Sequence, residues 1–172
     1  MRGERVLIFV TVGAQLPFDR LIRGVDEWAG RAPGADVFAQ IGGGEYAPHH
    51  LRWERFLSPT AFRHAMTQAD AVIGHAGVGT ILTALELGKP VLVFPRRAEF
   101  REHRNDHQLA TARYFAARGH VLAAFTEAEL LARIEWLRSH GRPGEPPSPA
   151  SPELIRRIRG QVFDQAEPAR VT

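Results

Sequence analysis

Cysteine and long apolar segments are missing from this chain of 172 residues. With no cysteine, the protein can form neither a disulfide nor a thiolate-ligated metal site. The longest uninterrupted apolar runs, such as Val6–Val10, are far shorter than the roughly 20 residues that a membrane-spanning helix needs. The sequence does not open with the basic, apolar and small-residue order of a secretory signal. We therefore expect a cytoplasmic protein built around an ordinary hydrophobic core.

Lysine is also scarce, with Lys89 as the single example, so arginine supplies almost all of the positive charge. The net charge of +3 resides in residues 96–172, because residues 1–95 hold nine basic and nine acidic side chains. A charge this small is no argument for nucleic-acid binding, and we expect no nucleic-acid partner. Arginine favours bidentate contacts with phosphate or carboxylate groups. The arginines of the second part therefore suit contacts with anions.

Short apolar strands alternate with amphipathic helices along residues 1–138, which predicts one α/β domain with a buried parallel sheet. The predicted strands are 6–12, 35–41, 51–57, 71–74, 90–94 and 120–125. Residues 139–152 contain five prolines and two glycines and predict an extended linker. Residues 153–172 predict a C-terminal amphipathic helix and tail.

The turn Gly74–Thr80 follows a predicted strand and opens a predicted helix. Parallel sheets bind ligands at the carboxyl ends of their strands, and a helix N-terminus attracts anions. The glycines of this turn would let a phosphate approach the backbone, and His75 would add an imidazole. The alternative is a tight turn that merely requires small residues. The turn is neither a Walker loop nor a dinucleotide fingerprint, because no Gly-Lys-Ser/Thr follows and the glycine spacing differs.

The segment Glu102–Gln108 concentrates hydrogen-bonding side chains, which suits a polyhydroxylated ligand. A metal site is the rival interpretation, since His103 and His107 are four residues apart and could share a helix face. The sequence places no third ligand, and we expect neither a metal nor a cofactor. The usual interpretation of the arginines around this segment is a solvated charged loop. These arginines are Arg96, Arg97, Arg101 and Arg104.

Residues 69–112 resemble the nucleotide-sugar-binding half of GT-B glycosyltransferases. The His-Ala-Gly…Gly-Thr turn at 75–80, the Leu-Gly-Lys-Pro at 87–90 and the Asp-His-Gln at 106–108 occur in the same order. The stretches 9–13 and 17–22 narrow the likeness to short subunits of split glycosyltransferases, the PssE or EpsE type of bacterial exopolysaccharide biosynthesis. The Pro-Arg-Arg and Glu-His segments after the fifth strand favour that branch.

The chain is similar also to the soluble subunit of the dolichol-linked N-acetylglucosaminyltransferase and to the C-terminal half of MurG. The resemblance covers residues 5–137. It implies a glycosyltransferase family 28 C-terminal domain with a Rossmann-like sheet, which is the donor-binding half of a GT-B enzyme.

The resemblance also implies a set of residues that bind a UDP-sugar. Phe56 and Leu57 would line the uracil pocket, and His107 and Gln108 would contact the sugar hydroxyls. The donor diphosphate would lie against Gly13, Ala14, His75, Gly77, Gly79 and Thr80. Several of these positions also have a structural interpretation, as core, strand end or helix surface.

At Thr83 the chain departs from many relatives, which carry a glutamate that binds the ribose hydroxyls. Thr83 offers a single hydroxyl. Glu86, one helical turn further on, would either substitute for that glutamate or be a solvated helix residue. No side chain is a convincing catalytic base, although His75 or a residue of the charged loop is a candidate.

One domain supplies only one wall of a GT-B cleft. The resemblance therefore implies a membrane-anchored partner subunit that binds a lipid-linked saccharide acceptor. We expect the donor-binding, catalytic subunit of a UDP-sugar-dependent hexosyltransferase (glucuronosyl-, galactosyl- or N-acetylglucosaminyl-). It would be active with its partner and held at the inner face of the membrane through that partner. The alternatives are a non-catalytic enhancer of a partner enzyme and an unrelated phosphate-binding α/β enzyme. The apolar stripe Ile155, Ile158 and Val162 would dock the partner or pack on its own domain.

Overall fold

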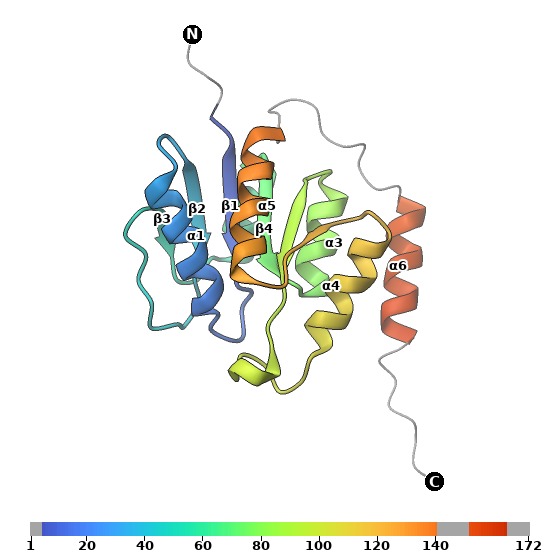
Figure 1. Ribbon diagram of the computed structural model, residues 1–172. Coiled ribbons are helices and arrows are strands. Elements are labelled where there is room, and N and C mark those ends of the chain that lie inside the picture. Colours follow the sequence, from blue (N-terminus) through green and yellow to red (C-terminus); the bar gives the residue numbers. More distant parts are fainter. Residues whose placement is uncertain (1–4, 141–151, 165–172) are drawn as a thin grey trace.

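Figure 1 shows the computed structural model, which describes residues 5–140 and 152–164. A sheet of six strands runs through its centre in the order β3-β2-β1-β4-β5-β6, and every neighbouring pair is parallel. This is the order of a doubly wound Rossmann-like sheet, so the expected fold class is confirmed. The strands are β1 (Leu7–Thr11), β2 (Asp36–Gln40), β3 (Arg52–Glu54), β4 (Ala71–His75), β5 (Val91–Phe94) and β6 (Leu122–Ala123).

Helices cover both faces of the sheet because side chains alternate between the two faces along each strand. The helices are α1 (Asp19–Arg31), α2 (Pro59–Gln68), α3 (Val78–Glu86), α4 (His107–Ala117), α5 (Glu127–His140) and α6 (Pro152–Asp164). In β1, Ile8 and Val10 pack in one buried cluster with α1 and α5, whereas Phe9 packs in a second cluster with α2, α3 and α4. A 3-10 turn, Ala98–Phe100, lies between β5 and α4.

The two edge strands are shorter than the sequence predicts. β3 holds only Arg52–Glu54, and β6 holds only Leu122–Ala123. Each pairs with a single neighbouring strand, so no second strand extends the pairing to the apolar residues beyond this segment. Helix α5 continues to His140, which makes the first two residues of the predicted linker helical. Residues 141–151 of that linker lie outside the described part of the chain.

A loop, residues 41–51, connects β2 to β3 and is held against α1 by a buried carboxylate. Asp26 accepts hydrogen bonds from the Tyr46 hydroxyl at 2.7 Å and from the backbone N–H groups of His49 and His50 at 3.1 and 2.7 Å. Burial raises the pKa of Asp26, but these hydrogen bonds outweigh that effect and the pKa lies below its usual value. The hydrogen bond from the Tyr46 hydroxyl to Asp26 raises the pKa of Tyr46 to about 12.

The last helix lies beside α3 (Figure 1). Ile155 is buried, and Arg159 forms an ion pair with Glu86 of α3. The part of α6 that is described therefore packs on its own domain. The side chains of Ile158 and Val162, the other members of the predicted stripe, lie outside the described set. Within residues 5–140 and 152–164, no helix has the length and apolar character that crossing a bilayer requires.

Candidate functional site

The chain changes direction between β1 and β4, because β1 leads into α1 on one face of the sheet and β4 into α3 on the other. Diverging connections leave a crevice at the carboxyl ends of such strands. A cavity of about 670 Å³ lies there, within the size range of small-molecule sites. We call it the switch-point cavity. Its lining comes from the β1–α1 turn, the ends of β2 and β4, and the segment around the start of α2. Helix α3, the loop after β5 and the first turn of α4 complete it.

The β1–α1 turn is shaped by Gly13, whose φ of +78° lies in the left-handed region. Its N–H donates to the Thr11 hydroxyl at 3.1 Å, and its carbonyl accepts from the amide of Gln40 at 3.1 Å. The Thr11 hydroxyl in turn donates to Gln40 at 2.7 Å. A Cβ at position 13 would lie 2.7 Å from the ring of His75. The turn is therefore rigid, and only glycine fits it.

His75 ends β4, and its imidazole lies between the backbones of Gly13 and Gly77. Burial lowers the pKa of His75 to about 4, and the nearby Arg96 guanidinium contributes. The imidazole is therefore neutral at pH 7. Its Nδ1 atom is buried and has no hydrogen-bond partner among the described residues. At neutral pH this histidine can offer a ligand a hydrogen bond but not a charge.

Gln108, in the first turn of α4, joins two strand ends. Its Oε1 accepts from the backbone N–H of Ala76 at 3.2 Å and from that of Arg96 at 3.0 Å. The side chain is buried and borders the switch-point cavity. Its acceptor oxygen thus stabilises the turns after β4 and β5, which leaves the amide NH₂ as the group available to a ligand. The predicted contact with sugar hydroxyls stays a prediction, in which the Gln108 amide N–H groups would donate the hydrogen bonds.

Arg96 follows β5 and is only 3% exposed. Its Nη2 donates to the carbonyl of Val12 at 2.7 Å and to that of Leu16, and its guanidinium stacks 4.9 Å from the ring centre of Phe18. Burial lowers the pKa of Arg96 to about 10, so it remains charged at neutral pH. Its Nε is buried without a partner among the described residues. The interpretation of all four arginines as a solvated loop was therefore wrong for Arg96.

An ion pair holds the loop after β5 against α1. Glu102 accepts from Arg20 Nε at 2.7 Å and from its Nη2 at 2.9 Å. The Arg20 guanidinium also lies over the rings of Phe94 and Phe100, at 4.2 and 4.8 Å from their centres. Both charges are mostly shielded from water, which makes the pair stronger than a surface pair when its hydrogen bonds are this complete. The loop that carries Arg96 and borders the cavity is thereby anchored.

The switch-point cavity is cationic and has no acidic lining. Arg63 and Arg96 supply the positive charge at its border, His75 and His103 add imidazoles, and no aspartate or glutamate borders it. Among the described residues, no group of three or more histidine and carboxylate side chains is placed to hold a metal ion. The first turn of α3 adds free backbone N–H groups and the positive end of a helix dipole. Together these features favour an anionic ligand.

The structure brings most of the predicted binding residues to this cavity, although no ligand tests their roles. Gly77 lies next to the His75 ring, whereas His107 is exposed and does not border the cavity. In its place His103, from the preceding loop, does. The predicted residues that border the cavity are Gly13, Ala14, Phe56, Leu57, His75, Gly79, Thr80, Thr83 and Gln108.

Thr83 and Glu86 answer the question that the missing glutamate raised. Thr83 borders the cavity, but its hydroxyl donates to the carbonyl of Gly79 at 2.9 Å within the helix. Glu86 forms an ion pair with Arg159 of α6 and does not border the cavity. Glu86 therefore has a structural partner, and no carboxylate among the described residues borders the cavity near Thr83.

Sequence reasoning missed the positions that build the cavity without being typical ligands, namely Gln40 and Arg96. A signal existed for Arg96, because it follows a buried strand directly and side chains at that place face the ligand edge of a parallel sheet. Gln40 also ends a buried strand, and its burial as an amide required partners that only the folded chain supplies.

Comparison with known protein families identifies the domain. Residues 7–156 match the model of the glycosyltransferase family 28 C-terminal domain. The chain belongs to this family. The human UDP-N-acetylglucosamine transferase subunit ALG13 is 32% identical over 129 residues, which are 66% of this chain and 10% of that protein. The subunit of the same name from Yarrowia lipolytica is 28% identical over 150 residues, which are 78% of this chain and 72% of that protein. This family 28 chain thus spans only a tenth of its human relative's length.

Solved structures share the fold of this family 28 domain. A solution structure of ALG13 has a TM-score of 0.61 at 22% identity and covers 90% of this chain and 95% of that one. MurG of Acinetobacter baumannii has a TM-score of 0.62 at 18% identity, covering 95% of this chain and 51% of that one. Identities this low establish the fold alone.

Proposed function

We propose that this family 28 domain is the donor-binding, catalytic subunit of a two-component glycosyltransferase. It would move a hexose from a UDP-sugar to a polyprenyl-diphosphate-linked acceptor in exopolysaccharide biosynthesis. The observation that carries the proposal is the switch-point cavity, where a glycine turn, a helix N-terminus and a buried arginine converge without any carboxylate. A nucleoside diphosphate carries the negative charge that such a cavity favours.

The donor would lie across the cavity with its base near the start of α2. Phe56 is 62% exposed and offers an unshielded aromatic face at the rim, while Leu57 packs partly into the core behind it. The diphosphate would then lie against the first turn of α3 and beside Arg96, and the sugar would face Gln108 and His103. The family resemblance supports the position given to the uracil base, and the charges of the cavity support the position given to the diphosphate.

Glycosyl transfer breaks the bond between the anomeric carbon and the diphosphate oxygen, while an acceptor hydroxyl forms the new bond and loses its proton. Negative charge develops on the departing UDP, and fixed cations and helix N–H groups stabilise it. Arg96 and α3 would serve that end of the reaction. A base must take the hydroxyl proton, and the neutral imidazole of His75 is mostly enclosed by its own backbone neighbours. We therefore assign the base to the acceptor-binding partner, a membrane-anchored subunit.

Gly79 provides a direct test of the donor site. A Cβ at Gly79 would meet no protein atom within 4 Å, so Gly79→Val should fold while its side chain enters the space where the diphosphate would lie. Calorimetry should show UDP binding to the wild type, tighter than uridine, and a loss of at least about tenfold in the variant. Gly160→Val is the matched control, since Gly160 is also helical and unobstructed but lies on α6. Equal UDP affinity in wild type and Gly79→Val would refute this site assignment.

The division into two subunits is tested by activity. The purified chain should bind UDP-sugar but transfer it negligibly, since one wall of a cleft cannot align donor, base and acceptor. Transfer should appear when a membrane-anchored acceptor subunit is added. Full activity of the isolated chain on a lipid-linked acceptor would contradict the split enzyme. A chain that activates its partner without binding UDP would instead be the enhancer, which the absence of a ribose-binding carboxylate at Thr83 favours.

A further inference from the structure

The loop between β5 and α4 carries a second surface, beside the switch-point cavity but not part of its lining. In Figure 1 this loop projects beyond the carboxyl ends of the strands, at the bottom of the view. Phe100, at the end of its 3-10 turn, is 50% exposed. Arg101 and Arg104 follow it and are exposed as well. Leu16, 40% exposed, lies at the same end of the molecule, where its carbonyl accepts from Arg96.

The charges of this loop are unevenly satisfied. Its acidic side chains have partners inside the loop or on α1: Glu99 pairs with a loop arginine, Glu102 with α1, and Asp106 with a loop N–H group. In contrast, Arg101 and Arg104 have no ion pair and no side-chain hydrogen bond among the described residues. Two arginines without an ion pair among the described residues therefore follow one exposed aromatic residue on an anchored loop.

Arg101 is held in an unusual backbone conformation. Its φ of 57° lies in the left-handed region, and among the described residues it is the one non-glycine residue found there. This conformation disfavours any side chain with a Cβ, so glycine would be the more stable choice. Such strain is typical of positions that present a side chain for a purpose other than stability.

We propose that Phe100, Arg101 and Arg104 contact a surface of anionic phospholipid, with the ring in the interfacial layer and the guanidinium groups on lipid phosphates. Aromatic rings gather at membrane interfaces, and basic side chains there are attracted to anionic headgroups. A protein interface usually has a contiguous apolar centre depleted in charge, which a single aromatic residue followed by two arginines does not provide. The contact itself is independent of the proposed function. Its consequence, that the cavity mouth faces the layer containing the lipid-linked acceptor, rests on that function.

Vesicle sedimentation tests the contact. The full chain should bind phosphatidylcholine vesicles that contain phosphatidylglycerol, should bind pure phosphatidylcholine vesicles far less, and should dissociate as salt shortens the Debye length. Arg104→Ser should weaken binding about fivefold, as expected for one basic side chain near an anionic membrane. Phe100→Ser should weaken it several-fold. Arg101→Gly should weaken it about fivefold while the thermal midpoint stays the same or rises, because glycine suits the left-handed conformation.

Two variants at other places control for charge and aromaticity. Arg31→Ser removes an exposed arginine from the last turn of α1, and Trp136→Ser removes another exposed aromatic side chain, on α5. Both should bind vesicles like the wild type. No vesicle binding, binding without dependence on phosphatidylglycerol, or equal binding by all five variants would overturn the proposal. So would variants that bind vesicles normally but no longer associate with the acceptor subunit, since the loop would then contact protein. UDP calorimetry on the same proteins tests the donor site separately.

Discussion

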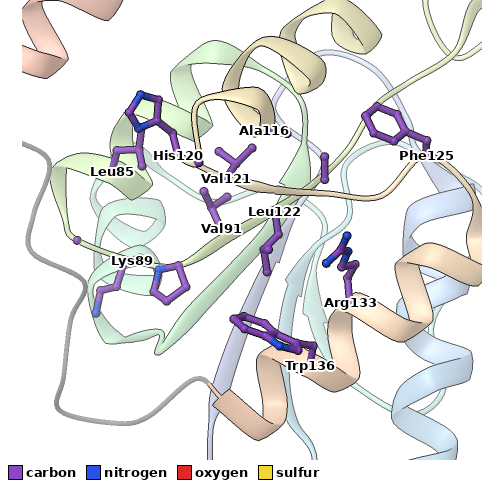
Figure 2. Close-up of a pocket in the computed structure, with 14 residues that line it drawn as sticks. Leu85, Lys89, Val91, Ala116, His120, Val121, Leu122, Phe125, Arg133 and Trp136 are labelled. Atoms are coloured by element: carbon purple, nitrogen blue, oxygen red, sulfur yellow. The ribbon is translucent and has the colours of Figure 1, made fainter.

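Two cavities of similar volume border the sheet, and they differ in the buried polar groups that line them. The switch-point cavity measures about 670 Å³, and a second one of about 650 Å³ lies along the outer edge of β6, near the amino ends of β5 and β6. We call the second the edge cavity (Figure 2). Val91, Leu122 and Trp136 are typical of its lining, with Lys89 and Arg133 at its border.

Buried polar groups separate the two cavities. Among the described residues, two side chains that border the switch-point cavity have a buried nitrogen without a partner, His75 and Arg96, and no side chain of the edge cavity does. Unpaired buried polar atoms cost free energy, so a protein keeps them where a ligand can use them. The edge cavity lies beside a strand of two residues, where the sheet simply ends. The two volumes are nearly equal, so the buried unpaired nitrogens are what distinguish the switch-point cavity as the candidate ligand site.

The largest difference should appear between two glycines with left-handed backbones. Gly119, at the edge cavity, has φ +70° and open space around a new Cβ, so Gly119→Ala should cost about 1 kcal/mol of unfolding free energy. At Gly13 the Cβ would also press on the His75 ring, so Gly13→Ala should cost about 4 kcal/mol. Urea unfolding measures both values. Equal losses would show that the Gly13 turn is no tighter than the edge one.

The next largest effect is a pH dependence due to His75. Its folded pKa of about 4 lies below the 6.5 of the unfolded chain, so the unfolded state binds the proton first as the pH falls. Its contribution to stability is therefore complete above pH 6.5 and is lost as the pH falls to 4, by about 3 kcal/mol. His75→Gln should remove this loss, whereas His120→Gln, at the edge cavity, should keep it. If both variants showed the same pH dependence of unfolding free energy, the effect would belong to a group other than His75.

Removing the amide that joins the turns after β4 and β5 should have a smaller effect. Gln108→Ala leaves the N–H groups of Ala76 and Arg96 without their acceptor. The cost should be about 2 kcal/mol, since water from the cavity can replace part of the bond. UDP affinity should fall as well, because the turn at the start of α3 loses its support. Gln68→Ala, an exposed amide on α2, is the control. Unchanged stability with lost sugar turnover would mean that Gln108 acts only on the ligand.

The smallest expected effect is at the edge cavity itself. Arg133 borders it on α5 and is exposed. Arg133→Met should change UDP affinity by less than about twofold, because charges separated by more than a Debye length are screened. Calorimetry under the conditions used for Gly79→Val measures this. A large loss would make the edge cavity, rather than the switch-point cavity, the place where the nucleotide binds.

Much of the fold is determined by the sequence alone, because it depends on local patterns. The apolar runs place β1, β4 and β5 within one or two residues of their observed bounds. Their alternation with amphipathic helices determines a parallel sheet, and a parallel sheet determines which edge binds ligands. The glycine turns at Gly13 and Gly77 could thus be assigned to one site although they are 64 positions apart in the chain.

Only the tertiary structure decided which side chains face that site. His107 and His103 are equally polar in sequence, but the start of α4 turns the first outward and leaves the second at the cavity. Glu102 pairs with Arg20 across 82 positions, and Glu86 pairs with Arg159 across 73. Burial of a charge such as Arg96 is favourable only once distant carbonyls surround it. Periodicity reports which face of an element is apolar, whereas the partner of a polar group depends on which elements the fold brings together.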